Sequence, residues 1–564
     1  MFSLTTVPLI LSLLLIFILY KTIRSLLLSH HNRLAASRLN CLPPPIQPNT
    51  LPLGLDHILS ALRSIRTKSF PLYLLDRSTK FPHHTFRTSI LNVPRLFTID
   101  VENIQAVLAT KFEDFDIGAV RGLNAHPFLG KGIFLQDGEE WERSRKLIRP
   151  QFSRGQIADL GVEERHFGEF VRAVESEGGI GKGGKGEDGW TGELDLQPLL
   201  FNLTLDAATE FLLGKSADSQ AGFLEKKKRE KNGESSGDGK GGEADAQAFG
   251  EAFDIGNEGL AKRSKFQPYP HWYTPKGWNK AIKTCNQYVD AIVAAHLEKR
   301  RETIDRKENS NSDSDLDSED EKEDEKKKAG GSYVFLEALA NSTQDPIELR
   351  SQIMHLLLAG RDTTASLTSW LLFLLLRSPS TLSTLRSEIL ATFGTYASCD
   401  PAQDITFEKI KACKYLQNCI HETLRLETVV PYNFRVANKD TFLPRGGGKG
   451  GKERVFVPKG EMVFYSSYVL HRREDLWGSD VSQFRPERWE GRKFGWEYIP
   501  FSGGPRICVG QQYAIIEASY IIIRLLQKYD KMENMDPVLE AKYHSTMTSC
   551  SANGVKVRLH KAQE

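Results

Sequence analysis

The segment Phe501-Ser-Gly-Gly-Pro-Arg-Ile-Cys-Val-Gly510 places one cysteine in a glycine- and proline-shaped loop, directly before a helix-forming run. Its glycines allow the backbone to approach a flat or crowded partner where a side chain would clash. Pro505 fixes the turn, and Arg506 offers a planar fork of donors that suits a carboxylate. Because a helix N-terminus stabilises a thiolate, the loop predicts that Cys508 is an anionic metal ligand. A buried structural cysteine in a glycine turn is the alternative that the loop alone leaves open.

The spacing Phe-x-x-Gly-x-Arg-x-Cys-x-Gly resembles the haem-binding loop of the haem-thiolate monooxygenases, the cytochrome P-450 superfamily. The resemblance implies haem b with the thiolate of Cys508 on its iron, and Phe501 and Arg506 beside the cofactor. It also implies a large, mainly α-helical (α+β) fold with small β-sheets. In that family the thiolate pushes electron density toward the iron, which favours cleavage of the O–O bond.

Composition narrows the possible functions. The 564 residues are 40% hydrophobic, which is ordinary for a globular protein, and the formal net charge of +2 argues against nucleic acid as the main partner. The seven cysteines contain no Cys-x-x-Cys pair, so they indicate neither a zinc site nor a secreted disulfide framework. This cysteine usage fits a reducing compartment.

The N-terminus is predicted to be a membrane anchor. Residues 2–20 carry no charge and are rich in Leu, Ile, Phe and Val, and a helix of that length, about 28 Å, nearly spans the hydrocarbon core of a bilayer. Basic residues from Lys21 onward place the rest of the chain on the cytoplasmic side. A cleaved signal peptide is the alternative, but no Lys or Arg precedes Lys21. The family resemblance then points to the cytoplasmic face of the endoplasmic reticulum.

The predicted organisation has three parts: a transmembrane anchor (1–22), a basic, proline-rich hinge (23–50) and one monooxygenase domain (51–564). A strand hairpin is expected over 85–100, and an irregular segment over 111–131. Three polar, low-complexity inserts have too few apolar residues to offset the entropy of ordering, so they are expected to be disordered. They lie near residues 178–189, 225–246 and 305–332.

Four further residues are candidates for holding the haem propionates. Trp141 and Arg145 lie four apart on one face of a predicted helix, and both are donors without acceptors. In the resembled family a Trp-x-x-x-Arg pair binds a propionate here, although a core tryptophan and a surface arginine would explain the two residues alone. Arg435, in a strand predicted over 429–437, and His471 are the other candidates. A lone histidine in such a context is often a satisfied core residue.

A long helix is predicted from Pro346 to about Arg377, and its centre is poor helix sequence. The run Ala359-Gly-Arg-Asp-Thr-Thr364 contains Gly and Thr, which cost helix stability, and a local rule broken inside a strong helix often marks a functional site. The run matches the Ala-Gly-x-Asp-Thr-Thr of the family, which implies that Asp362 and Thr363 organise proton delivery. A surface aspartate beside a packing kink is the alternative.

Glu422 and Arg425 are predicted to form a structural pair on one helix face. The pattern Glu-x-x-Arg alone occurs by chance in most long chains. Here it precedes Phe484-Arg-Pro-Glu-Arg-Trp489 and the cysteine loop, in the order that the family shows. The resemblance implies that Glu422, Arg425 and Arg488 lock the loop behind the haem.

Several segments resemble the fungal branch of the family that hydroxylates n-alkanes and fatty acids at the chain end, among them Leu129-Gly-Lys-Gly-Ile-Phe134 and Asn433-Phe-Arg-Val-Ala437. The pair Glu427-Thr428 departs from that branch, which has an aromatic residue and then proline. The resemblance implies electrons from NADPH through a separate reductase, or through cytochrome b5, and an apolar substrate. A hydroxylase of a bulkier lipid or secondary metabolite, an O2-independent isomerase or dehydratase, and a haem sensor are the alternatives.

Overall fold

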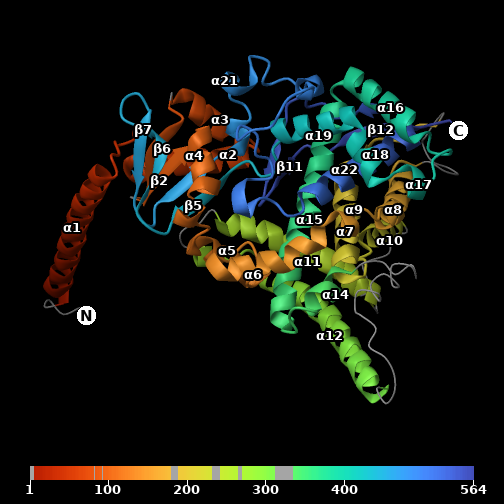
Figure 1. The fold of residues 1–564 in the computed structure, drawn as a ribbon, viewed down its shortest axis with the longest axis horizontal. Helices are drawn as coiled ribbons and strands as arrows, with labels where there is room; N and C mark the ends of the chain where they lie inside the picture. Colours follow the sequence, from red (N-terminus) through yellow and green to blue (C-terminus); the bar gives the residue numbers. More distant parts are fainter. Residues whose placement is uncertain are drawn as a thin grey trace.

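Helices dominate the structure, a computed structural model that describes residues 6–81, 83–91, 93–179, 189–231, 242–264, 270–310 and 334–563. Figure 1 shows one helical body, with one group of strands on the side nearest the N-terminal helix α1 and further strands near the C-terminus on the opposite side, while α1 itself stands away from the body. The expected mainly α-helical architecture with small β-sheets is therefore confirmed.

Helix α1 (Thr6–Arg38) is longer than the sequence suggested. It continues beyond residue 22 through much of the segment predicted as a hinge, because no glycine or proline lies between Tyr20 and Pro43. Within the described residues, Ser12–Arg38 is the one helix long and apolar enough to cross a membrane. Near its C-terminal end, α1 contacts the body through His31 Nε2, which lies 3.3 Å from Asp440 Oδ2.

The largest sheet has the strand order β1-β2-β8-β5-β3. Strands β1 (Thr85–Ile90) and β2 (Val93–Thr98) form the predicted antiparallel hairpin. Strand β5 (Asn433–Ala437) pairs with β8 (Met462–Tyr465). It begins four residues later than the strand predicted over residues 429–437. The other strands are β3 (Phe115–Asp116), β4 (Leu194–Asp195), β6 (Thr441–Gly447), β7 (Glu453–Val457), β9 (Tyr529–Asn534), β10 (Tyr543–Ser545), β11 (Ser549–Ser551) and β12 (Lys556–Lys561).

Helix α15 (Pro346–Leu375) is the predicted long helix and runs through the core. Asp345 caps it by accepting from the Ile347 N–H, and Pro346 occupies its first turn. Most of its side chains are buried, as expected of a mainly apolar helix in a protein core. It packs on α9 (Leu196–Leu213), α19 (Lys414–Leu426) and α22 (Gln511–Lys528). Because α22 directly follows the cysteine loop, this packing brings α15 and the helix after that loop together.

The other α-helices surround this core (Figure 1). They are α2 (Leu55–Arg66), α3 (Phe70–Lys80), α4 (Val101–Gln105), α5 (Ala119–Leu129), α6 (Gly138–Ile148), α7 (Arg154–Ile157), α8 (Gly161–Glu177), α10 (Ser219–Lys231), α11 (Gly242–Ser264), α12 (Trp278–Ser310), α14 (Phe335–Ala340), α16 (Pro379–Phe393), α17 (Pro401–Asp404), α18 (Phe407–Ala412), α20 (Ser467–Leu470) and α21 (Glu474–Trp477).

Two predictions about irregular segments were wrong in part. Residues 111–131 contain strand β3 and helix α5, which forms despite Pro127 near its C-terminal end. The inserts are shorter than expected, because α10 extends to Lys231, α11 begins at Gly242 and α12 extends to Ser310. The remaining parts of the inserts lie outside the described residues. Charged residues such as Lys and Glu are good helix formers, so polar composition alone did not separate helix from loop.

Candidate active site

The cysteine loop is fixed by backbone contacts on both sides of Cys508. The Cys508 N–H donates to the Phe501 carbonyl at 3.0 Å, and Gly510 caps the helix α22 that follows. Gly504 has a φ of +66°, and a Cβ there would lie 1.8 Å from the Leu108 carbonyl oxygen. Only glycine fits that position, because both the backbone conformation and the close approach exclude a side chain.

Cys508 differs from the other six cysteines, since its side chain is exposed while theirs are buried. The surrounding protein nevertheless raises the pKa of its thiol by burial, and the Gly510 N–H and the Arg145 charge act in the opposite direction. A bound metal cation deprotonates a coordinating thiol directly.

Cationic and aromatic side chains gather beside the loop. The Arg145 guanidinium donates to the Ile507 carbonyl at 3.0 Å and lies 5.7 Å from the Trp141 ring on the same helix. Arg506 also lies near that ring, at 4.3 Å, and pairs with Asp137 at 2.7 Å. The structure thus brings together Trp141, Arg145 and Arg506, as the sequence predicted.

Arg435 joins this group with a second arginine that the sequence did not single out, Arg121 of α5. The buried Arg435 donates to the Phe434 carbonyl at 2.9 Å, and Arg121 donates to Asn433 Oδ1 at 2.7 Å. Burial and the neighbouring Arg435 charge lower the pKa of Arg121 to about 10. Because residues 111–131 looked irregular in sequence, nothing there distinguished Arg121 from a surface arginine.

These four arginines, Arg121, Arg145, Arg435 and Arg506, form what we call the arginine cluster. Among the described residues, Asp137 is the one carboxylate within ion-pair distance of any of them. Arg435 is buried, and a buried guanidinium is normally paired, so this part of the cluster favours a further anion. Haem b carries two carboxylates and fits this surplus of donors, and the exposed Cys508 sulfur fits its iron.

His471 does not belong to this group, which corrects the sequence prediction. Its Nε2 accepts from the Ile499 N–H at 2.9 Å, and its Nδ1 lies 3.1 Å from the Thr428 hydroxyl. Burial lowers the pKa of this histidine to about 3, so the ring is neutral. With both nitrogens bonded to protein, His471 is a core residue that supports the loop.

Glu422, Arg425 and Arg488 form the predicted network. Glu422 and Arg425 are completely buried and joined by two hydrogen bonds of 2.8 and 2.9 Å. Glu422 also accepts from Arg488 Nε at 2.9 Å and from the Trp489 indole at 3.0 Å. Arg425 reaches the carbonyls of His471 and Val481. The network ties α19 to the segment that leads into the cysteine loop.

Asp362 and Thr363 lie at the centre of α15. The Thr363 hydroxyl donates to the Ala359 carbonyl at 2.5 Å, one turn back, as the sequence suggested. Asp362 is buried and accepts from Asn257 Nδ2 at 3.1 Å and, more weakly, from Arg361 Nη1 at 3.4 Å. Burial raises the pKa of Asp362 to about 6, against the lowering effect of Arg361. This carboxyl is therefore poised to gain and lose a proton near neutral pH.

The raised pKa of Asp362 predicts a pH-dependent gain of stability in Asp362→Asn. The folded protein binds the Asp362 proton more tightly than the unfolded chain does, so this residue makes stability fall as pH rises from about 4 to about 6. A shift from 3.8 to about 6 corresponds to about 3 kcal/mol, present in full above pH 6. We expect the unfolding free energy of Asp362→Asn to exceed that of the wild type by up to that amount at pH 7.5 and by almost nothing at about pH 4.

Urea unfolding at the two pH values, followed by circular dichroism, measures this difference. Asp76→Asn, which alters an exposed carboxylate on α3, serves as the control. A less stable Asp362→Asn protein at pH 7.5 would contradict the prediction.

The fold and the site together define a haem-thiolate protein, and comparison with known families agrees. Residues 58–553 match the cytochrome P450 family, and the chain belongs to it. It is 43% identical over 544 residues to "Cytochrome P450 monooxygenase g430" from Fusarium sp, a match that covers 96% of this chain and 88% of the relative.

Two other relatives extend the comparison. "Cytochrome P450 monooxygenase alt2" from Alternaria solani is 38% identical, with 92% of this chain and 91% of the relative covered. "Cytochrome P450 52A3-B" from Candida maltosa is also 38% identical, with 90% and 89% covered. The protein is therefore a cytochrome P450 monooxygenase, a class whose cofactor is haem held by a cysteine thiolate.

Proposed function

We propose that this protein hydroxylates n-alkanes or fatty acids at the chain end, with electrons supplied by a membrane-bound, NADPH-dependent reductase. The observation that carries the proposal is the joint presence of the exposed Cys508 thiol, the arginine cluster and the acid–alcohol pair of α15 in one core. The resemblance of residues 129–134 and 433–437 to the fungal terminal-hydroxylase branch supports the substrate class.

Each residue has a role in this proposal. Cys508 ligates the iron, Phe501 lies on the same loop, and the haem supplies the activation of O2 when it is bound. Trp141 and the arginine cluster hold the haem carboxylates. Asp362 passes protons toward the place where O2 would bind. The Thr363 hydroxyl, which donates to the Ala359 carbonyl, helps to orient the group that delivers the proton. Burial favours this proton transfer because it places the pKa of Asp362 near the working pH.

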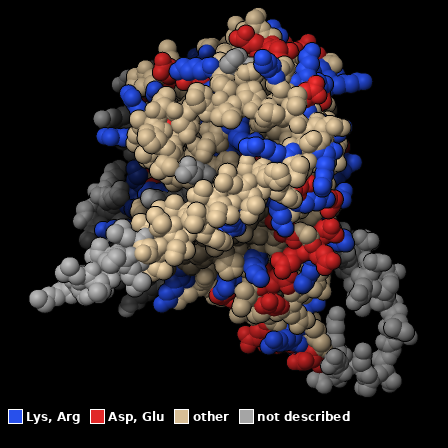
Figure 2. Space-filling model, turned by 90° about the vertical axis from the view of Figure 1, so that its left-hand side faces the viewer, with Lys and Arg blue, Asp and Glu red and all other residues tan. Residues whose placement is uncertain are grey.

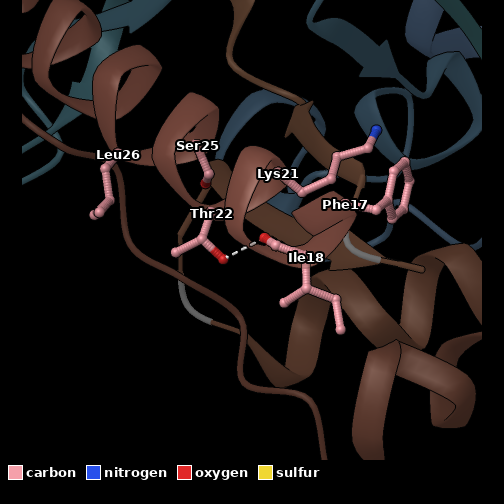
Figure 3. A pocket seen from close by; sticks show the side chains of 6 residues that line it. All are labelled: Phe17, Ile18, Lys21, Thr22, Ser25 and Leu26. Carbon is pink, nitrogen blue, oxygen red and sulfur yellow. Dashed lines mark hydrogen bonds between the residues drawn. The ribbon is translucent and has the colours of Figure 1, made fainter. Parts of the chain in front are cut away.

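Helix α1 supports attachment to a membrane, with the body on the cytoplasmic face of the endoplasmic reticulum. Figure 2 shows α1 as a ridge with few charged residues over most of its length. In Figure 3 the Thr22 hydroxyl donates to the Ile18 carbonyl at 2.8 Å, so this polar group is satisfied within the helix. On α2 the exposed Leu55, Leu59 and Leu62 share one face, which suits contact with lipid.

An acidic electron donor would find a basic face on α6. Lys146 of α6 and Arg149, directly after the helix, are exposed, and neither has an ion-pair partner among the described residues. Arg143, on the same helix, pairs with Glu348 at 3.0 Å and so contributes less free charge. We infer that the reductase, or cytochrome b5, docks on this face.

Product analysis tests the substrate class. The full-length protein with a NADPH-dependent reductase is incubated with labelled dodecane, lauric acid and a sterol in separate reactions. We expect terminally hydroxylated products from the first two. Oxidation of the sterol alone would favour the hydroxylase of a bulkier lipid, and turnover without reductase or O2 would favour an isomerase or dehydratase.

A further inference from the structure

Helix α11 contributes two polar residues to the centre of α15. Asp254 and Asn257 lie three residues apart, hence on one face of α11. Asp254 pairs with Arg361, and Asn257 donates to the neighbouring Asp362 at 3.1 Å. The two contacts join segments that are more than 100 residues apart in sequence.

Arg361 makes only a long contact with Asp362, although the two residues are adjacent. Its guanidinium contacts Asp254 much more closely than it contacts Asp362, which lies at 3.4 Å. The Arg361 charge is therefore shared with a second carboxylate. The other titratable groups that act on this site are Asp206 of α9, through Arg361, and the Cys550 thiol of β11. Asn257 thus provides the shortest hydrogen bond to the Asp362 carboxylate among the described residues.

The second polar atom of Asn257 is unused. Asn257 is buried, and its Oδ1 has no hydrogen-bond partner among the described residues. Leaving a buried acceptor unpaired costs about 1–3 kcal/mol, so its presence beside a carboxyl needs an explanation. A protonated Asp362 would supply the missing donor.

A buried carboxyl that relays protons needs a different partner in each state. The charged form accepts hydrogen bonds, whereas the neutral form must also donate one. Asparagine carries both a donor and an acceptor on one amide, and rotation about its terminal torsion exchanges them. A hydrophobic residue offers neither, and a lysine or arginine would hold the carboxyl in the charged form.

We propose that Asn257 is a positioning residue for proton delivery. Its amide donates to Asp362 when that acid is charged and, after rotation, accepts from Asp362 when it is protonated. The Asp362 carboxyl then keeps a hydrogen bond with Asn257 in both of its protonation states. This proposal rests on the proposed role of Asp362. Because Asn257 belongs to α11, proton delivery also depends on α11 staying packed against α15.

The test uses full-length holoenzyme carrying Asn257→Leu, which keeps the branched shape and removes both hydrogen-bonding atoms. With lauric acid and reductase, we expect the product formed per NADPH to fall about tenfold, less than the 10²–10⁴ that is typical of losing an acid–base group itself. H2O2 release should rise, and the solvent isotope effect on turnover should increase. Asn257→Ser, which retains a donor and an acceptor, should recover part of the loss.

Two measurements separate this effect from a merely structural one. The ferrous–CO spectrum and the substrate dissociation constant should remain those of the wild type. Asn124→Leu is the matched control, since Asn124 of α5 is also buried, also contacts α11 through the Leu260 carbonyl at 3.2 Å, and also has an unpartnered Oδ1. It should affect stability without raising the H2O2 yield.

A double-mutant cycle with Asp362→Asn decides between the possible outcomes. The quantity compared is the coupling, meaning the product formed per NADPH consumed. If Asn257 acts through Asp362, Asn257→Leu should change the coupling little when Asp362 is already Asn. Wild-type coupling in Asn257→Leu, or an equal effect of this substitution in both backgrounds, would overturn the proposal for Asn257. Wild-type coupling in Asp362→Asn itself would instead refute the proposed role of Asp362.

Discussion

Cys508→Ser protein should show no thiolate-type Soret band in its ferrous–CO spectrum and no hydroxylated product. The cause is electronic, because a neutral serine hydroxyl cannot donate charge to iron as a thiolate does. The backbone that presents position 508 is fixed by the Phe501 carbonyl and by Gly504, so the change should act on the ligand and leave the loop in place. We expect product formation to fall by at least about 10³-fold, the scale on which loss of an essential reacting group is felt.

Cys41→Ser is the matched control for this experiment. Cys41 is buried near the end of α1 and makes only a weak contact with the Leu39 carbonyl. That variant should keep the spectrum and the activity of the wild type. A thiolate-type Soret band that persists in Cys508→Ser would show that another residue ligates the iron.

Glu422→Gln should cost about 3–5 kcal/mol of unfolding free energy, the usual effect of breaking a buried ion pair by removing one partner. Two guanidiniums, those of Arg425 and Arg488, depend on this carboxylate, and Arg425 and Glu422 are completely inaccessible to solvent. Neutral glutamine cannot balance them, and its amide group would face other donors. Because the network supports the segment before the cysteine loop, we also expect weaker haem retention.

Glu427→Gln gives the comparison that isolates the network. Glu427 is also buried on the same stretch of chain, but its ion pair with Arg472 is longer, at 3.3 Å. Burial raises the pKa of Glu427, so its charge is costly, and only one guanidinium, that of Arg472, loses a partner; its loss should therefore be less destabilising than that of Glu422. Urea unfolding followed by circular dichroism and haem absorbance measures both variants. Equal losses would mean that the Glu422 network is no more important than an ordinary buried pair.

Features that depend on short sequence spacing were predictable. The glycines and proline around Cys508 define a turn wherever the loop lies, and Trp141 and Arg145 share a helix face because they are four residues apart. The pairing of Glu422 with Arg425 follows from the same helical geometry. The unusual residues of α15 were visible because they contradict the helix that surrounds them.

Features that depend on contacts between distant segments were not predictable. His471 was a candidate haem residue until its two nitrogens were found bonded to Thr428 and Ile499. Arg121 looked like part of an irregular loop, and the structure places it on a helix beside Arg435. Helix α1 extends beyond the predicted anchor for a simpler reason, because charge marks the edge of a bilayer and does not stop a helix.

The sequence by itself determined the candidates for the chemistry of this protein: a candidate cysteine ligand in a glycine loop, candidate donors for haem carboxylates, and an acid with an alcohol inside a long helix. These depend on residue type and on spacings of three to ten residues, which backbone geometry fixes locally. Only the tertiary structure decided which groups serve one another, including the pairing of Asn257 with Asp362 across 105 residues. Burial sets those pairings, since a polar group removed from water must take whatever partner packing brings to it.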